Sequence, residues 1–296
     1  MDALNAELVP LEGGHTGETF LAIGPEGPSV VRLYTGAGDR RGPDAANIDA
    51  ELLKWMRGLL PVPEVLEVRR PDAALGLPAL LVTSRLQGVR GDHVLGSLDS
   101  GGRGRVAKEL AKILVRLSLV RTPRWGVFAG ADLRMAGSPD LWRDLEAFLK
   151  SDGRELTRGW SARERAALQR RAAEAQELVD GDPASCLVHG DFQPSNLLLD
   201  PDRLQVTGLV DWERARSGHR YEDLGRLLRA IPDAAFRGAV LEALDSLEEA
   251  LGLAPTNQRL EKARAADLFA LVERASQRSS HPEVKEAQHR LRELSQ

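Results

Sequence analysis

Short apolar runs, separated by clusters of Gly and Pro, form the pattern of the first third of the chain. Runs that are rich in Val, Leu and Ile and bounded in this way predict the strands of an antiparallel sheet. We place such strands at residues 8–11, 19–23, 30–34 and 79–83. One helix is expected among them, from about Asp44 to Arg57, because Pro61 and Pro63 prevent its continuation.

A helical period replaces this pattern near residue 87. Apolar residues fall on one face of a helix at positions 106, 110, 113, 114 and 117. Ser161 and Glu164 have the spacing of a capping box, which predicts a long helix that ends at about Asp180. Further helices are expected from about Tyr221, whereas the glycine-rich segment 101–104 is interpreted as a connector.

The change of pattern predicts an α+β protein with a small sheet-rich lobe, residues 1–86, and a large helical lobe, residues 87–296. Its 296 residues, 42% hydrophobic and 28% charged, are ordinary for a soluble globular chain. A net charge of −4 disfavours nucleic acid as a partner. The single Cys excludes an intrachain disulfide and suits the reducing cytosol. With no signal peptide and no membrane-spanning run, we expect a cytoplasmic protein without a membrane partner.

Two clusters of polar residues interrupt the apolar runs of the second lobe. The stretch CLVHGDFQPSNLLLD places His189, Asp191 and Asn196 on a loop between two short apolar runs, and LVDWE places Asp211 after another. Phosphoryl transfer needs a carboxylate near the acceptor hydroxyl, together with an amide and a carboxylate that hold Mg²⁺. Asp191 and Asn196 have the Asp-x-x-x-x-Asn spacing of kinases. These residues predict a catalytic Asp191 and a magnesium site at Asn196 and Asp211.

Each of these residues has a plainer interpretation. His189 and Asp191 have a His-x-Asp spacing that recurs in zinc sites, although only 6 His are present and no second ligand pair lies nearby in the sequence. Asp191 alone is also typical of a turn or helix cap. Asn196 and Asp211 at matching positions favour the catalytic interpretation.

The two motifs together resemble the aminoglycoside phosphotransferase and choline kinase-like family, whose pattern is HGDxxxxN, a strand, and then (I/V)DW. The resemblance implies a two-lobed protein-kinase-like fold, ATP and Mg²⁺ as cofactors, and transfer of a phosphoryl group to a hydroxyl of a small molecule. It also implies that Asp191 takes the proton of the acceptor hydroxyl and that His189 braces the loop. Asp223 resembles a family residue that supports the next helix, and Trp212 is expected to pack behind the metal site.

The resemblance extends to the small lobe, with departures. LEGGHTGETF, between the first two strands, matches the nucleotide loop, so Gly14, His15 and Gly17 are candidate phosphate contacts. The loop lacks the third glycine of GxGxxG and fits a simple hairpin turn equally well. Family enzymes have a Lys on the third strand that pairs with a helix Glu, but this chain has Arg32 in VVRLY. Glu51 is the matching helix carboxylate, and we expect it to pair with Arg32.

The stretch LLVTSRLQG resembles the hinge between the lobes, where adenine meets backbone groups. The candidate hinge residues are Thr83, Ser84, Arg85 and Leu86.

The acceptor is the least defined part of the prediction. Family acceptors include aminoglycosides, other antibiotics, choline, homoserine and sugars. The acidic face of residues 242–249 is interpreted as solvent exposure rather than a pocket for polycations. Three arginines after the metal motif favour a neutral or anionic acceptor: Arg214, Arg216 and Arg220.

We expect an antibiotic acceptor and a role in resistance. The alternatives are a primary-metabolite kinase of the same fold and a non-catalytic nucleotide-binding module. The protein is expected to be a monomer or a homodimer.

Overall fold

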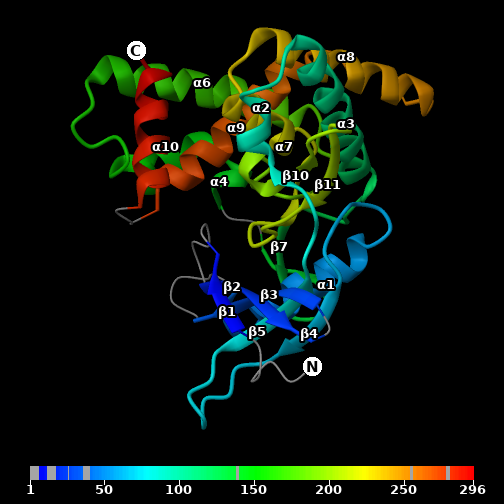
Figure 1. The fold of residues 1–296 in the computed structure, drawn as a ribbon. Coiled ribbons are helices and arrows are strands. Elements are labelled where there is room, and N and C mark those ends of the chain that lie inside the picture. The colour runs from blue at the N-terminus through cyan, green and yellow to red at the C-terminus, as the bar shows by residue number, and fades with distance from the viewer. Residues whose placement is uncertain are drawn as a thin grey trace.

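A computed structural model gives the fold and describes residues 7–11, 18–25, 27–35, 41–137, 140–253, 256–277 and 281–296. A small lobe of strands with one long helix lies below a large, mostly helical lobe (Figure 1). This architecture confirms the predicted α+β class with two lobes. The last strand of the small lobe ends at Ser84, and the lobe limits at residues 86 and 87 stay a prediction.

The small lobe is built on a five-stranded antiparallel sheet in the order β1-β2-β3-β5-β4. Its strands are β1 (Glu7–Pro10), β2 (Glu18–Gly24), β3 (Gly27–Tyr34), β4 (Val65–Arg69) and β5 (Ala79–Ser84). The strands expected from the apolar runs are all present, but β4 was not predicted. Glu67 and Arg69 interrupt its apolar residues, and a shift of register between Val65 and Glu67 breaks its period.

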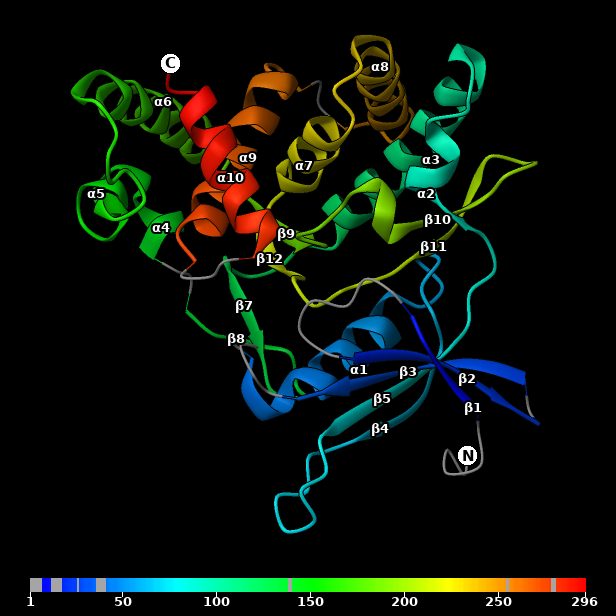
Figure 2. The ribbon, with the colours of Figure 1, turned by 60° about the vertical axis from the view of Figure 1, so that its left-hand side comes forward.

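One helix, α1 (Ala45–Met56), packs against β4 and β5 and begins and ends within one residue of its predicted limits. It ends where Arg57 adopts an extended backbone, with φ −60° and ψ 130°. Its buried residues Ile48, Leu52 and Met56 belong to a hydrophobic core that continues into the large lobe. Figure 2 shows α1 on the side of the sheet that is turned toward the large lobe.

The large lobe contains the remaining helices of the described chain. They are α2 (Gly91–Leu95), α3 (Ser100–Leu119), α4 (Asp140–Arg143), α5 (Leu145–Lys150), α6 (Ala162–Asp180), α7 (Glu222–Ala230), α8 (Ala234–Ala250), α9 (Arg259–Ala275) and α10 (Pro282–Glu293). Short 3₁₀ turns lie at Gly42–Asp44, Asp152–Arg154 and Pro194–Asn196. The predicted capping box at Ser161 and Glu164 is confirmed, with both of its hydrogen bonds formed. Among the described residues, none of these helices has the length and apolar character that a membrane span requires.

The glycine-rich segment 101–104 is not a connector, so this prediction was wrong. It forms the first turn of α3, where the side chain of Asp99 accepts a hydrogen bond from the backbone N–H of Gly102. A Cβ on Gly102 would lie 3.3 Å from Leu98 and 3.4 Å from Leu204. A good N-cap therefore outweighs the low helix propensity of the glycines, and at Gly102 the small residue permits close packing.

Two small sheets carry the polar motifs. One has the order β11-β10-β6 and the other β8-β7-β12-β9. Their strands are β6 (Val89–Arg90), β7 (Gly126–Ala129), β8 (Arg134–Met135), β9 (Ser185–Val188), β10 (Leu197–Asp200), β11 (Gln205–Leu209) and β12 (Arg216–His219). Leu197 of β10 pairs with Leu209 of β11, so the residues before the first strand and after the second come together. This register brings the two motifs side by side.

Candidate active site

Asp191 lies on the loop between β9 and β10 and is 4% exposed. The side-chain N–H groups of Asn196 donate to the backbone oxygen of Asp191 at 2.9 Å and to its Oδ2 at 3.0 Å. Gln193 Nε2 also donates to Oδ2, at 3.2 Å. The loop thus holds this carboxylate in one orientation before any substrate arrives.

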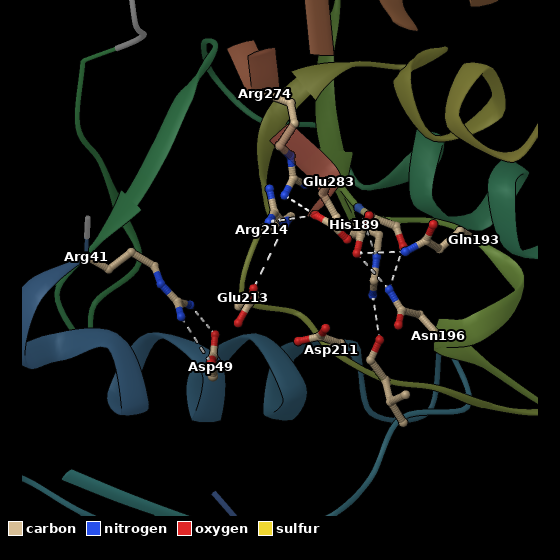
Figure 3. Close-up of polar contacts among 12 residues, drawn as sticks. Arg41, Asp49, His189, Gln193, Asn196, Asp211, Glu213, Arg214, Arg274 and Glu283 are labelled. Atoms are coloured by element: carbon tan, nitrogen blue, oxygen red, sulfur yellow. Dashed lines mark hydrogen bonds and ion pairs between the residues drawn. The ribbon is translucent and has the colours of Figure 1, made fainter. Parts of the chain in front are cut away.

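His189 joins the two motif loops. Its Nδ1 accepts a hydrogen bond from the backbone N–H of Asp191 at 3.3 Å, and its Nε2 lies 3.0 Å from the backbone oxygen of Val210 (Figure 3). Burial lowers the pKa of His189 to about 4, so the ring is neutral and Nε2–H donates to Val210. Trp212 packs against the ring with centroids 4.9 Å apart. Among the described residues, no group of three or more His, Cys, Asp or Glu is arranged to hold a metal ion.

Asp223, in the first turn of α7, supports the same loop from below. Its carboxylate accepts hydrogen bonds from the backbone N–H of His189 at 2.7 Å and from that of Gly190 at 2.9 Å. Burial raises the pKa of Asp223 to about 7, against the opposing effect of these two hydrogen bonds. Gly190 has φ 76°, and a Cβ there would lie 2.4 Å from the backbone oxygen of Arg214. The glycine of the motif is therefore required by the close approach of the two loops.

Asp211 follows β11 with a left-handed backbone, φ 66°. The backbone N–H of Val210 donates to the backbone oxygen of Asn196 at 3.0 Å, so the two predicted metal ligands are neighbours (Figure 3). Burial and the negative charge of Glu213 raise the pKa of Asp211 to about 6, while Arg32 opposes the rise. Asn196 donates through its amide nitrogen, which leaves its amide oxygen for a ligand. A carboxylate and an amide oxygen are ligands that Mg²⁺ prefers, so the donor set fits this metal.

Arg32 of β3 reaches this cluster but does not pair with Glu51, so that prediction was wrong. Its Nη1 lies 3.1 Å from Asp211 Oδ1, and its Nη2 pairs with Glu213. Glu51 pairs instead with Lys54 at 2.8 Å on the exposed side of α1. The buried carboxylate of this helix is Asp49.

Asp49 lies on the buried side of α1, where Glu51 had been expected, but its partners are Tyr34 and Arg41. It accepts a hydrogen bond from the hydroxyl of Tyr34 at 2.6 Å and pairs with Arg41 (Figure 3). Its negative charge also acts on Arg32. It is 3% exposed. Leu52 and Leu53 follow Asp49 by three and four residues, so the three side chains lie on the same, buried face of α1. This spacing was the available signal in the sequence.

The remaining candidates for nucleotide contacts are the glycine-loop residues and the hinge residues. Gly14, His15 and Gly17 lie outside the described residues. The hinge candidates form the end of β5 and the crossing to β6, which pairs with β10 of the large lobe. Ser84 is fixed to Glu64 by a backbone hydrogen bond of 2.8 Å and a side-chain hydrogen bond of 2.9 Å. The candidates Thr83, Ser84, Arg85 and Leu86 therefore lie where the chain passes between the lobes, and their contact with adenine stays a prediction.

Arg226 of α7 contacts Asp191 and was missed by the sequence interpretation. Its Nη2 lies 2.6 Å from Asp191 Oδ1 and 3.1 Å from Gln193 Oε1. Burial favours a higher pKa for Asp191, but the positive charges of Arg226, Arg214 and Arg274 outweigh it and hold the pKa below its ordinary value. Arg226 follows Asp223 by three residues and so shares its face of α7, which was the available signal.

Arg216 and Arg220 do not reach the site, contrary to the expectation for three arginines. Arg216 pairs with Glu222 at 2.7 Å and with Glu273 at 3.2 Å, and Arg220 pairs with Glu248 at 2.6 Å. Glu248 is 3% exposed, so the acidic face of residues 242–249 is not wholly solvent-exposed either. These charges stabilise the packing of the helices, and only Arg214 of the three lies near Asp191.

The sequence is similar to known phosphotransferases. The family model described as the phosphotransferase enzyme family matches residues 7–254. The aminoglycoside 3′-phosphotransferase of Streptomyces fradiae is 29% identical over 188 residues, which are 62% of this chain and 63% of that enzyme. The chain therefore matches less than two thirds of that enzyme's length. The streptomycin 3″-kinase of Streptomyces griseus is 27% identical over 269 residues, covering 82% of this chain and 89% of that enzyme.

Solved structures show the same fold. The GDP complex of aminoglycoside 2′-phosphotransferase-IIIa superposes with a TM-score of 0.71 at 17% identity and covers 98% of this chain and 92% of that one. A thermostable mutant of aminoglycoside phosphotransferase APH(4)-Ia with ADP and hygromycin B has a TM-score of 0.64 at 20% identity, covering 98% and 93%. The predicted protein-kinase-like fold is thus confirmed.

Proposed function

The chain belongs to the phosphotransferase enzyme family, and on this premise we propose that it transfers the γ-phosphoryl group of ATP to a hydroxyl group of a small molecule. The observation that carries the proposal is the joining of Asp191, Asn196 and Asp211 into one cluster. The side chain of Asn196 donates a hydrogen bond to Asp191, and its backbone oxygen accepts one from Val210, the residue before Asp211. A non-catalytic nucleotide-binding module has no need of an oriented carboxylate beside a metal site.

Asp191 orients the acceptor hydroxyl and takes its proton in this proposal. A carboxylate whose pKa lies below its ordinary value is ionised at neutral pH and is therefore ready to accept a hydrogen bond from the hydroxyl. Its weak basicity suits a loose transition state, in which positioning and charge neutralisation do most of the work. Its hydrogen bonds to Asn196 and Gln193 fix the direction of approach.

Asn196 and Asp211 would hold Mg²⁺ with the nucleotide. The metal neutralises the charge of the transferring phosphates when it is bound. Burial, and after it the negative charge of Glu213, raise the pKa of Asp211 to about 6, and a bound cation would favour the ionised carboxylate. Arg32 lies against the same carboxylate, and we assign it to the nucleotide side of Asp191 for this reason.

ATP is proposed to lie between the lobes, with its adenine at residues 83–86. The solved neighbours named with nucleotides include complexes with ADP, AMP-PNP and GDP. The relatives named for their acceptors act on aminoglycosides and streptomycin, so an antibiotic hydroxyl is the acceptor class that the comparisons favour. A role in antibiotic resistance or self-resistance follows from this choice.

The test is ATP consumption over a panel of hydroxylated antibiotics and metabolites, in wild type and in Asp191→Asn. This variant removes the proton acceptor with little change of shape, so we expect turnover to fall by about three orders of magnitude or more while Mg·ATP still binds. Asp202→Asn is the matched control, because Asp202 lies in an exposed turn. Near-normal turnover in Asp191→Asn would show that the assignment is wrong.

A further inference from the structure

The two carboxylate oxygens of Asp191 have different partners among the described residues. Oδ2 accepts hydrogen bonds from Asn196 at 3.0 Å and from Gln193 at 3.2 Å. Oδ1 lies 2.6 Å from Nη2 of Arg226 and has no second donor in the described chain. Each oxygen of an ionised carboxylate accepts about two hydrogen bonds. Oδ2 is therefore fully engaged, whereas Oδ1 keeps one position for a further donor.

Arg226 also fixes the side-chain amide of Gln193. Nη2 of Arg226 donates to Gln193 Oε1 at 3.1 Å, and Gln193 Nε2 donates in turn to Asp191 Oδ2. The three side chains thus form a closed ring of hydrogen bonds. A flipped amide would turn its oxygen toward the carboxylate oxygen, so the contact with Arg226 selects the orientation in which both bonds form.

The attachment of the Asp191 loop to α7 does not depend on Arg226. Asp223 already holds the loop backbone, because its carboxylate accepts hydrogen bonds from the N–H groups of His189 and Gly190. Arg226 instead contacts the side chain of Asp191. Its Nε is buried without a hydrogen-bond partner in the described chain, a cost that the contacts of Nη2 must offset. The placement of this guanidinium is thus directed at the carboxylate.

A second arginine of α7 has a purely structural position. Arg229 pairs with Asp267 of α9 at 2.8 Å and so joins the two helices. Its side chain is 21% exposed, against 16% for Arg226, so the two arginines are similarly screened by water. They differ in their partner, which is a carboxylate between helices for Arg229 and the proposed proton acceptor for Arg226.

We propose that the acceptor hydroxyl meets Asp191 at Oδ1 and that Arg226 is the positioning residue that holds this oxygen in place. The inference rests on the proposed function, since it assigns one atom as the proton acceptor of that reaction. The acceptor oxygen forms a bond to the γ-phosphorus, and the bond from this phosphorus to the β–γ bridging oxygen breaks with its electron pair left on ADP. The hydroxyl proton passes to Oδ1. Because Oδ2 is engaged and Arg226 occupies one position of Oδ1, one direction of approach remains.

The test is the kcat of Arg226→Met and Arg226→Lys at saturating Mg·ATP, with two acceptors. One is water, measured by phosphate release, and the other is the compound with the highest turnover in the panel of antibiotics and metabolites. Arg226→Met frees Oδ1 to turn away, so we expect kcat to fall about ten- to a hundredfold with the KM of ATP unchanged. Arg226→Lys keeps the charge and should recover part of this loss. Arg229→Met is the matched control and should keep kcat close to that of wild type.

A double-mutant cycle with Gln193→Met separates positioning from a general loss of stability. Arg226→Met and Gln193→Met break the same ring of hydrogen bonds, so their effects should not be independent. We expect the kcat of the double variant to exceed the product of the two single effects by about threefold. In the cycle of Arg229→Met with Gln193→Met, the two effects should multiply. Calorimetric binding of Mg·AMP-PNP shows that each variant is folded, and Arg226→Lys replaces Arg226→Met in the cycle if the latter does not fold.

Several results would overturn the proposal. One is a kcat of Arg226→Met equal to that of Arg229→Met, and another is multiplication of the effects of Arg226→Met and Gln193→Met. A rise in the KM of ATP with kcat unchanged would also overturn it, since Arg226 would then serve the nucleotide. A wild type that turns over neither water nor any compound of the panel contradicts the proposed function, and the inference with it. That result differs from an active wild type beside an equally active Arg226→Met.

Discussion

The two sides of Asp191 hold charges of both signs in different arrangements among the described residues. On the metal side, Asp211 contacts Arg32, and Glu213 lies between Arg32 and Arg214. On the acceptor side, the three arginines Arg214, Arg226 and Arg274 face Asp191 and Glu283. Each of these arginines thus has a carboxylate partner among the described residues, and Asp191 lies between the two arrangements.

The two sides also differ in how the chain builds them. The metal side comes from Asn196, just before β10, and from Asp211 and Glu213, just after β11, with Arg32 reaching across from the small lobe. The acceptor side is assembled from the loop before β12 and from α7, α9 and α10. The proposed nucleotide and metal site thus depends on two short motifs, whereas the proposed acceptor side depends on how the helices pack. Substitutions on the acceptor side can change specificity without touching the metal ligands.

The largest effect is expected on the metal side, from Asp211→Ala. Loss of the carboxylate should reduce turnover by about a hundred- to a thousandfold and abolish the tightening of ATP binding by Mg²⁺, because a hard dication needs this oxygen. Calorimetric titration of ATP with and without Mg²⁺ measures the effect, with Asp132→Ala, at an exposed side chain, as the control. An unchanged Mg²⁺ dependence would remove Asp211 from the metal site and end the contrast between the two sides.

The next effect concerns two carboxylates of α1, the buried Asp49 and the exposed Glu51. Asp49→Ala leaves Tyr34 and Arg41 without their buried carboxylate, and we expect a loss of about 2–3 kcal/mol in the free energy of unfolding. Glu51→Ala removes only an exposed pair with Lys54 and should change it by less than about 0.5 kcal/mol. Urea denaturation of both variants decides between them, and equal losses would contradict the correction.

This pair of residues shows what could be predicted of the fold and of the metal side. Local patterns predicted four strands of the small sheet, the limits of α1 and the capping box of α6, because each depends on nearby residues. The same holds for Asp191, Asn196 and Asp211, which the pairing of β10 with β11 brings together. The choice of Glu51 failed because motif order was used where the buried face of the helix was the better guide.

The acceptor side was beyond local patterns. Arg226, Arg274 and Glu283 lie on three helices separated by long stretches of sequence, and no spacing relates them. Arg216 and Arg220 were expected there because they follow the metal motif, but β12 turns them toward carboxylates of the helical core. A charged residue shows its sign in the sequence, whereas its partner is decided by tertiary packing.

The strand that supports the acceptor side should give a pH-dependent stability. His219 ends β12 just before α7, and burial lowers its pKa from 6.5 to about 4. Between these values the unfolded chain takes up a proton that the folded chain does not, so lowering the pH favours unfolding. This contribution is complete above pH 6.5 and is lost as the pH falls toward 4. Between pH 7 and 5 the loss is about 2 kcal/mol.

The measurement is the change in the free energy of unfolding between pH 7 and pH 5, in wild type and in His219→Gln. Buried carboxyl groups with raised pKa values, such as Asp223, act in the opposite direction, so only the difference between the two proteins isolates His219. His289→Gln is the control, since the His289 side chain is 68% exposed. A pH dependence that is the same in wild type and in His219→Gln would show that this ring is not held neutral.

The smallest effect should come from Arg32→Lys, which tests whether the metal side depends on charge or on shape. The fork of Arg32 contacts Asp211 with one nitrogen and Glu213 with the other. An ammonium group keeps the charge but is expected to reach only one of these carboxylates at a time, so one charge-assisted contact is lost. We expect the KM of ATP to rise about three- to tenfold, with the KM of the acceptor unchanged. Steady-state kinetics in both substrates measures this split. A rise in the acceptor KM alone would mean that Arg32 serves the acceptor side and not the nucleotide.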